Sequence, residues 1–126
     1  MKTNLARIVF LIFLLPVAIC GQENLGKEDL AFWKEKAKPV LQKNCWKCHG
    51  AEKKIKGDLV LTTRQGVLDG GEIGPAADLE KPDASLLLQM ISYKDEHHKM
   101  PPKGELSYEE LKTLKKWIQL DLPLHP

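Results

Sequence analysis

Residues 45–50 read Cys45-Trp46-Lys47-Cys48-His49-Gly50, and this is the most informative segment of the sequence. Two cysteines three residues apart lie on one turn of a helix, and a histidine follows the second cysteine directly. A disulfide between Cys45 and Cys48 would close a very small loop and would stabilise the chain little. A structural crosslink is therefore a poor explanation for this spacing.

The C-x-x-C-H spacing is typical of c-type haem attachment. Each of two neighbouring vinyl groups of haem takes one thiol to form a thioether, and the imidazole that follows is placed under the iron. We therefore expect Cys45 and Cys48 to form the covalent bonds and His49 to be the proximal iron ligand. Two other interpretations have less support. A zinc site lacks a second spaced pair of ligands, and a thioredoxin-like redox pair lacks its βαβ pattern.

The second axial ligand has three candidates in the sequence. Met100 precedes Pro101-Pro102, so we expect it in a stiff, extended segment that can hold a thioether against a haem face. His97 and His98 stand among charged residues and are expected to be solvated. Met90 falls on the apolar stripe of a helix and is expected in the core. The residues favour Met100, while the other candidates, or no sixth ligand, stay open.

The N-terminus has the features of an export signal. Lys2 and Arg7 precede an apolar run at positions 8–20. This run is shorter than the roughly 20 residues that span a bilayer, and it ends in a small-x-small cleavage site at Cys20. We expect residues 1–20 to be a signal peptide, with an acylated Cys20 or a retained anchor as alternatives. All three place the protein in the periplasm, the cell envelope or the secreted fraction.

The composition limits the chain to one small domain of nearly balanced charge. Its 126 residues include 19 Lys and Arg and 17 Asp and Glu; without residues 1–20, which hold two of those basic residues, 17 of each sign remain. This balance excludes a nucleic-acid binder that works by bulk charge. With 43% hydrophobic and 29% charged residues, most of the chain is expected to fold. We expect a polar lead-in at 21–28 and one domain at 29–123.

Hydrophobic periodicity predicts a mainly α-helical domain. An apolar stripe over residues 29–43 predicts a first helix, with a kink or restart near Lys38 because Pro39 has no N–H to donate. Ser107 and Glu110 form a capping box at the start of a last helix. The apolar positions of that helix share one face: Leu111, Leu114, Trp117 and Ile118.

Short helices joined by loops are predicted for the middle of the chain. Thr62 or Thr63 is expected to cap a brief helix. Asp83 is expected to cap a second one over residues 84–92. Residues 94–104 contain no helical pattern and are expected to be irregular.

A set of short segments occurs in a fixed order along most of the chain: Pro39-Val40-Leu41, the motif at 45–50, Lys56-Gly57-Asp58-Leu59, the glycine-rich loop at 70–75, Pro82-Asp83-Ala84-Ser85-Leu86-Leu87, Met100-Pro101-Pro102, and the segment from Leu106-Ser107 to Trp117-Ile118. With these segments, positions 32–123 resemble the planctomycete-type cytochrome c domain, a branch of the class I c-type cytochrome family. The resemblance implies N- and C-terminal helices packed around one covalent haem c. It implies thioether bonds to Cys45 and Cys48, and His49 and Met100 as the axial ligands.

We therefore expect a monohaem electron carrier, not an enzyme, whose iron alternates between Fe(II) and Fe(III). Its expected partners are redox proteins and not nucleic acid, and only an N-terminal lipid or signal anchor would reach a membrane. If Met100 does not bind, a five-coordinate haem enzyme or a gas or peroxide sensor is the alternative; an interaction module stabilised by haem is another. The Pro75 carbonyl is expected to accept the second ring proton of His49. Trp117 is expected near the haem and the first helix.

Overall fold

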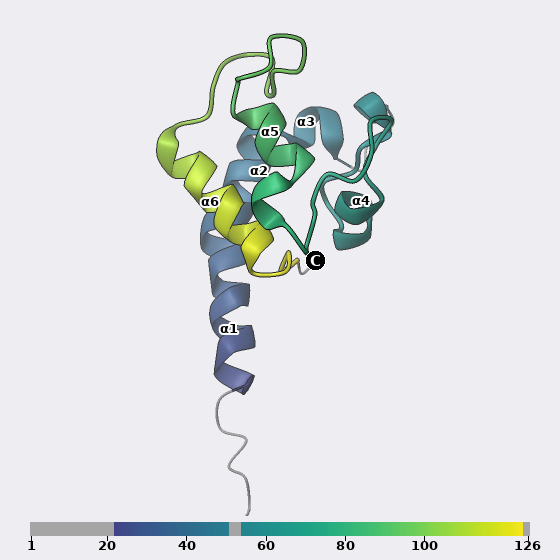
Figure 1. Cartoon of the computed structure of the whole chain (residues 1–126). Coiled ribbons are helices and arrows are strands. Elements are labelled where there is room, and N and C mark those ends of the chain that lie inside the picture. Colours follow the sequence, from purple (N-terminus) through teal and green to yellow (C-terminus); the bar gives the residue numbers. More distant parts are fainter. Residues whose placement is uncertain (1–21, 51–53, 125–126) are drawn as a thin grey trace, which may run out of the picture.

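The mainly α-helical fold expected from the sequence is confirmed. The computed structural model describes residues 22–50 and 54–124, and these ranges contain helices and loops but no β-strand (Figure 1). One isolated bridge joins Gly71 to Gly74. No helix within these ranges has the length and apolar character needed to cross a membrane. The expected signal peptide at residues 1–20 lies outside the described residues.

Three consecutive elements form the N-terminal helices: α1 (Gln22–Phe32), the π-helical turn η1 (Trp33–Ala37) and α2 (Lys38–Asn44). The expected restart near Lys38 is confirmed, since α2 begins there with Pro39 in its first turn. Because Pro39 has no N–H to donate, the turn before it is wide, and the Lys38 N–H donates to the carbonyl of Trp33. The helix also starts at Gln22, so the described part of the expected polar lead-in is helical. Glutamine, glutamate and lysine in that stretch favour a helix.

The remaining elements follow the cysteine motif: α3 (Trp46–His49), η2 (Lys56–Asp58), α4 (Arg64–Asp69), η3 (Pro82–Ala84), α5 (Leu86–Ile91) and α6 (Tyr108–Gln119). The cap expected near the start of α4 is confirmed, because the Thr63 hydroxyl accepts the N–H of Gly66 at 3.0 Å. The capping box of α6 is also confirmed: the Ser107 hydroxyl accepts the N–H of Glu110, and the Glu110 carboxylate accepts the N–H of Ser107.

The helix cap expected at Asp83 is wrong. Asp83 lies in η3, and Ser85 is the N-cap residue of α5. The buried Ser85 hydroxyl accepts the N–H of Asp78 at 2.9 Å. The Asp83 carboxylate instead accepts hydrogen bonds from α6, at 2.9 Å from Lys115 and 3.1 Å from Gln119. The hydrogen bond from Lys115 lowers the pKa of Asp83. A contact with a distant helix therefore replaces the local cap.

The core lies where α6 crosses the N-terminal helices. α6 packs on η1 and α2, and α5 packs on α6 (Figure 1). The rings of Trp33 and Trp117 stack at this crossing, with centroids 5.7 Å apart and planes at 24°. Both are buried, and Trp117 Nε1 donates to the carbonyl of Pro123 at 3.1 Å. The predicted contact of Trp117 with the first helix is confirmed. Further buried side chains around the pair are Leu41, Leu114, Ile118 and Leu122.

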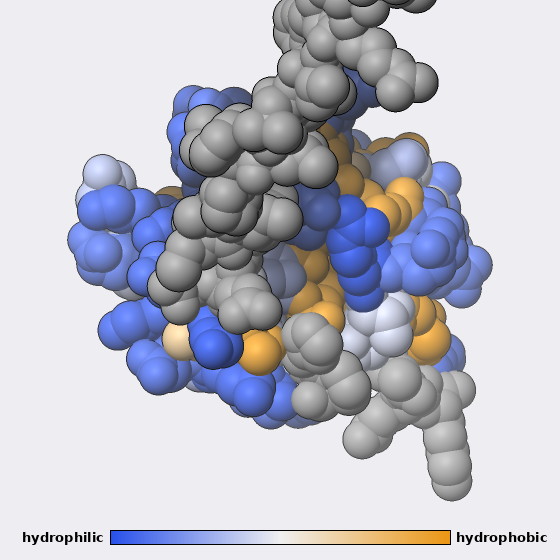
Figure 2. Space-filling view, turned by 90° about the horizontal axis from the view of Figure 1, so that it is seen from below, coloured by the Kyte–Doolittle hydropathy of each residue, from blue (hydrophilic) through white to orange (hydrophobic). Residues whose placement is uncertain are grey.

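The surface is mostly hydrophilic on the face that Figure 2 shows, with smaller hydrophobic areas between the charged side chains. Within the described ranges, three large hydrophobic side chains are exposed: Ile73, Met100 and Tyr108. Ile73 and Met100 both line the pocket described below. Exposed apolar side chains therefore lie at the edge of that pocket.

Candidate functional site

Helix α3 begins at the cysteine motif. Cys45 is its N-cap residue, and the Cys45 carbonyl accepts the N–H groups of Cys48 at 3.1 Å and His49 at 2.9 Å. Trp46 lies between the cysteines, and its Nε1 donates to the carbonyl of Leu61 at 3.2 Å. The N–H of Leu61 in turn donates to the carbonyl of His49 at 2.8 Å. One helical turn thus holds Cys45, Cys48 and His49, and the hydrogen bonds with the backbone of Leu61 fix that turn in place.

An apolar pocket opens beside α3. It holds about 880 Å³ of empty space, including space open to solvent. Cys45, His49 and Met100 line it. Its walls are mainly aliphatic and include Leu59, Leu61, Ala76, Leu86, Leu87 and Ile91. Three of the four residues predicted to hold a cofactor therefore meet at one cavity.

The two cysteines have different surroundings. Both are free thiols, but Cys45 is buried and lines the pocket, whereas Cys48 is half-buried and lies outside the lining. Burial raises the pKa of Cys45 to about 11, with smaller contributions from Cys48 and Glu110. The Cys45 thiol is therefore protonated near neutral pH.

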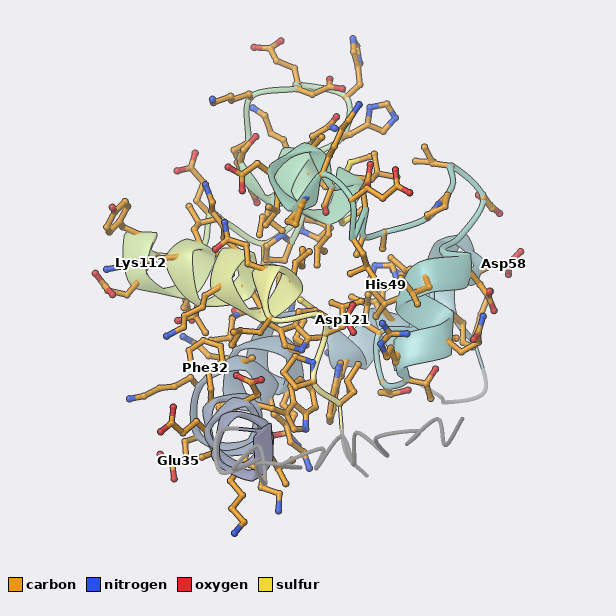
Figure 3. The ribbon with its side chains drawn as sticks, turned by 60° about the horizontal axis from the view of Figure 1, so that its bottom comes forward. Phe32, Glu35, His49, Asp58, Lys112 and Asp121 are labelled. Atoms are coloured by element: carbon orange, nitrogen blue, oxygen red, sulfur yellow. The ribbon has the colours of Figure 1, made fainter. Side chains whose placement is uncertain are left out.

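The His49 imidazole lies toward the middle of the molecule, whereas Glu35 and Lys112 lie at its periphery (Figure 3). Its Nδ1 is buried and has no hydrogen-bond partner among the described residues. The predicted bond from the His49 ring to the Pro75 carbonyl is therefore wrong. Leaving a buried polar atom without a hydrogen bond costs about 1–3 kcal/mol. Nearly all buried polar atoms in folded proteins have a partner, so this exception requires an explanation. The His49 ring lines the apolar pocket, and an imidazole in that place suits an iron ligand.

Met100 reaches the pocket from the loop between α5 and α6. This loop is irregular, as predicted for residues 94–104. Met100 is 37% exposed, and its N–H donates to the carbonyl of Met90 at 3.1 Å. The next residue, Pro101, accepts a hydrogen bond on its carbonyl from the Tyr93 hydroxyl. Met90 is half-buried and also lines the pocket, so the expectation that it belongs to the core is wrong.

His97 and His98 are exposed, as expected, and they also line the edge of the pocket. His98 Nδ1 lies 2.8 Å from a carboxylate oxygen of Asp95, whose other oxygen accepts the N–H of His97 at 2.9 Å. The hydrogen bond with His98 lowers the pKa of Asp95. Every sequence candidate for the second ligand thus lies at the same pocket. Within 22–50 and 54–124, no three His, Cys, Asp or Glu side chains gather as a metal-binding group.

Glu110 has a role that the sequence did not reveal. Besides its capping bond to Ser107, its carboxylate accepts from Lys43 Nζ at 3.0 Å and from Asn44 Nδ2 at 3.2 Å. The backbone bond from Ser107 and the side-chain bond from Lys43 lower the pKa of Glu110 to about 2. Asn44 directly precedes Cys45. Glu110 therefore fixes the start of α6 to the residue before the motif, across a separation of 66 residues that no local pattern covers.

The site fits covalently bound haem, the group that the C-x-x-C-H motif implies. Aliphatic walls suit a flat, mostly apolar macrocycle, and the lining offers a thiol, an imidazole and a thioether. Cys45 and Cys48 would hold the group covalently. The imidazole of His49 and the sulfur of Met100, which both line the pocket, would be available to its iron.

Comparison with known proteins agrees with this fit. Residues 45–104 match the family model described as Planctomycete cytochrome C. This range begins at Cys45, includes Met100 and stops before α6. Searches of curated proteins and of solved structures found no match. The resemblance seen in the sequence is confirmed over residues 45–104, where this chain is similar to the planctomycete cytochrome C family.

Proposed function

We propose that this chain is a monohaem c-type cytochrome that carries electrons between redox partner proteins. Its family supports a haem-binding cytochrome. The observation that carries the proposal is the single apolar pocket lined by Cys45, His49 and Met100. Bound haem would supply one iron that alternates between Fe(II) and Fe(III).

The residues of the pocket have distinct roles in this proposal. Cys45 and Cys48 fix the group to α3 by two thioether bonds, and His49 offers a ring nitrogen to the iron from the same helical turn. Met100 offers its sulfur from the loop between α5 and α6. If His49 and Met100 both bind the iron, no position on it would be left for a substrate, which favours electron transfer over catalysis. Methionine ligation also raises the reduction potential relative to a second histidine.

The edge of the pocket suits electron exchange with another protein. Ile73 is 63% exposed, and it lines the same pocket as the partly exposed Met100. Lys99 also lines the pocket, and Lys47 on α3 is exposed. An apolar rim with basic side chains nearby offers a partner protein both a contact area and a charge preference. No large basic surface for nucleic acid is expected from a chain of balanced charge.

The proposal includes export from the cytoplasm. Covalent haem attachment in bacteria takes place outside the cytoplasm, and the apolar run before Cys20 has the form of an export signal. We propose a location in the periplasm, the cell envelope or the secreted fraction, with lipid attachment at Cys20 as the alternative to cleavage.

The test is to express the full chain in a host that attaches haem after export. We expect a haem-stained band on a denaturing gel, a mass increased by one haem, and a low-spin spectrum with a weak far-red methionine–iron band in the ferric state. A redox titration should give a single one-electron wave. A high-spin ferric spectrum with binding of peroxide or a diatomic gas would instead support the five-coordinate alternative. A mature chain with the mass of its amino acids alone would refute the proposal.

A further inference from the structure

We propose that Tyr93 is a positioning residue that holds Met100 at the pocket. The inference rests on the proposed function, in which the Met100 sulfur binds the haem iron. Tyr93 follows the end of α5 by two residues. Its φ is +58°, in the left-handed region that a bulky side chain rarely adopts. Because this conformation is unfavourable for tyrosine, contacts of its side chain are expected to stabilise it.

The Tyr93 hydroxyl holds the chain directly after Met100. It donates a hydrogen bond to the carbonyl of Pro101. On the other side, the N–H of Met100 donates to the carbonyl of Met90, in the last turn of α5, at 3.1 Å. The backbone is therefore bonded on both sides of the Met100 side chain to one short stretch, residues 90–93. Two such points fix the position of Met100 relative to α5, which no single bond would do.

The helix that carries these bonds is itself fixed. Leu87 and Ile91 of α5 are buried in the core and also form part of the pocket wall. Residues 94–100, between α5 and Met100, are all exposed and contain no helix. The position of Met100 thus depends on the two bonds to residues 90–93 more than on packing within its own loop. Tyr93 does not line the pocket, so it acts through Met100 and not by contact with the cofactor.

The two parts of the Tyr93 side chain have separate contacts. Lys99 Nζ lies 5.9 Å from the centroid of the ring, at a cation–π distance, whereas the hydroxyl contacts Pro101. Tyr93→Phe keeps the ring and its contact with Lys99, and removes only the hydroxyl. The second of the two tyrosines provides a matched control, because Tyr108 is 75% exposed at the start of α6 and lies outside the pocket.

The experiment compares Tyr93→Phe, Tyr108→Phe and the unchanged protein as exported holoproteins. Three quantities are measured: the far-red methionine–iron band of the ferric state, the reduction potential, and the affinity of ferric iron for added imidazole. In Tyr93→Phe we expect a weaker band, a lower potential, and imidazole affinity raised about fivefold, the factor that one neutral hydrogen bond is worth. Tyr108→Phe should match the unchanged protein in all three.

Limited trypsin digestion separates positioning from plain structural support. Cleavage after Lys94, Lys99 or Lys103 should be faster in Tyr93→Phe, because the loop has lost one attachment. Faster cleavage with an unchanged band, potential and imidazole affinity would overturn the proposal while leaving the proposed function intact. An unchanged protein that lacks the far-red band, with the same spectrum in Met100→Ala, would overturn both this proposal and the assignment of Met100 as an iron ligand.

Discussion

The helix crossing and the pocket are built in opposite ways. At the crossing, Trp33 and Trp117 are stacked and buried, and Trp117 Nε1 has its acceptor in the Pro123 carbonyl. At the pocket, His49 Nδ1 is buried without a partner and Met100 is 37% exposed. The polypeptide alone thus completes the crossing, whereas at the pocket it leaves a buried ring nitrogen without a hydrogen bond and an apolar side chain partly in solvent. Changes at the pocket should alter cofactor properties, and changes at the crossing should alter stability.

The largest effect is expected when both motif cysteines are replaced. Cys45→Ala with Cys48→Ala removes every thiol from the described residues, so no thioether can form there. We expect complete loss of the haem-stained band on a denaturing gel. The single variants should each keep one attachment, because either thiol alone can form one thioether. A stained band of full intensity from the double variant would contradict the assignment of the motif.

Replacing Met100 tests the other side of the pocket. Met100→Ala should keep the covalent haem but lose the far-red band, and the iron should bind added imidazole. We expect the reduction potential to fall by on the order of 0.2 V, well within the range of ~0.8 V that axial ligands span. Met90→Leu is the control, since Met90 lines the same pocket and keeps its backbone bond to Met100. An unchanged potential in Met100→Ala would assign the ligand to His97 or His98.

At the crossing, Trp117→Ala should act on stability and not on the iron. Trp117 is fully buried and lies outside the pocket lining. Its truncation should lower the free energy of unfolding by about 3–5 kcal/mol, as measured by denaturant titration of the holoprotein. The methionine–iron band of the folded protein should remain. Tyr108→Ala, an exposed position on the same helix, should change stability little. Loss of the band in Trp117→Ala would mean that the two regions are not separable.

The smallest effect concerns Glu110, which connects the two regions. Its pKa is lowered to about 2 from the ordinary 4.5, so it stabilises the fold fully above about pH 4.5 and loses this contribution as the pH falls toward 2. Glu110→Gln should be less stable than the unchanged protein by about 1 kcal/mol near neutral pH, after allowance for solvent screening. The difference should shrink below about pH 4.5 in denaturant titrations. The neighbouring, exposed Glu109→Gln is the control; an equal loss there would contradict the assignment.

Local chemistry made several elements predictable. The caps at Thr63 and Ser107 and the restart before Pro39 depend on bonds within a few residues, so the sequence contains all that decides them. The same holds for the helical turn from Cys45 to His49. Met100 was favoured from its prolines alone, and the structure brings it to the same pocket as the motif.

Contacts between distant residues decided what could not be predicted. Asp83 was expected to cap its own helix, but hydrogen bonds from α6 hold its carboxylate, 32 residues from Lys115. The hydrogen bonds that Asn44 and Lys43 donate to Glu110 span 66 and 67 residues. The hydrogen bond of the Tyr93 hydroxyl and the lack of a hydrogen bond at His49 Nδ1 likewise depend on how the loops are placed in space. No periodicity or capping pattern encodes such distances.

The stacked tryptophans have a consequence for what counts as the folding unit. The stretch that matches the family begins after Trp33 and finishes before Trp117, so it contains neither ring. A fragment trimmed to those boundaries would include the predicted cofactor-binding residues. It would lack both Trp33 and Trp117, whose stacked rings join the N-terminal helices to α6. Boundaries chosen for expression or for grafting onto another protein should therefore extend from α1 at least through Pro123, whose carbonyl accepts the Trp117 indole N–H.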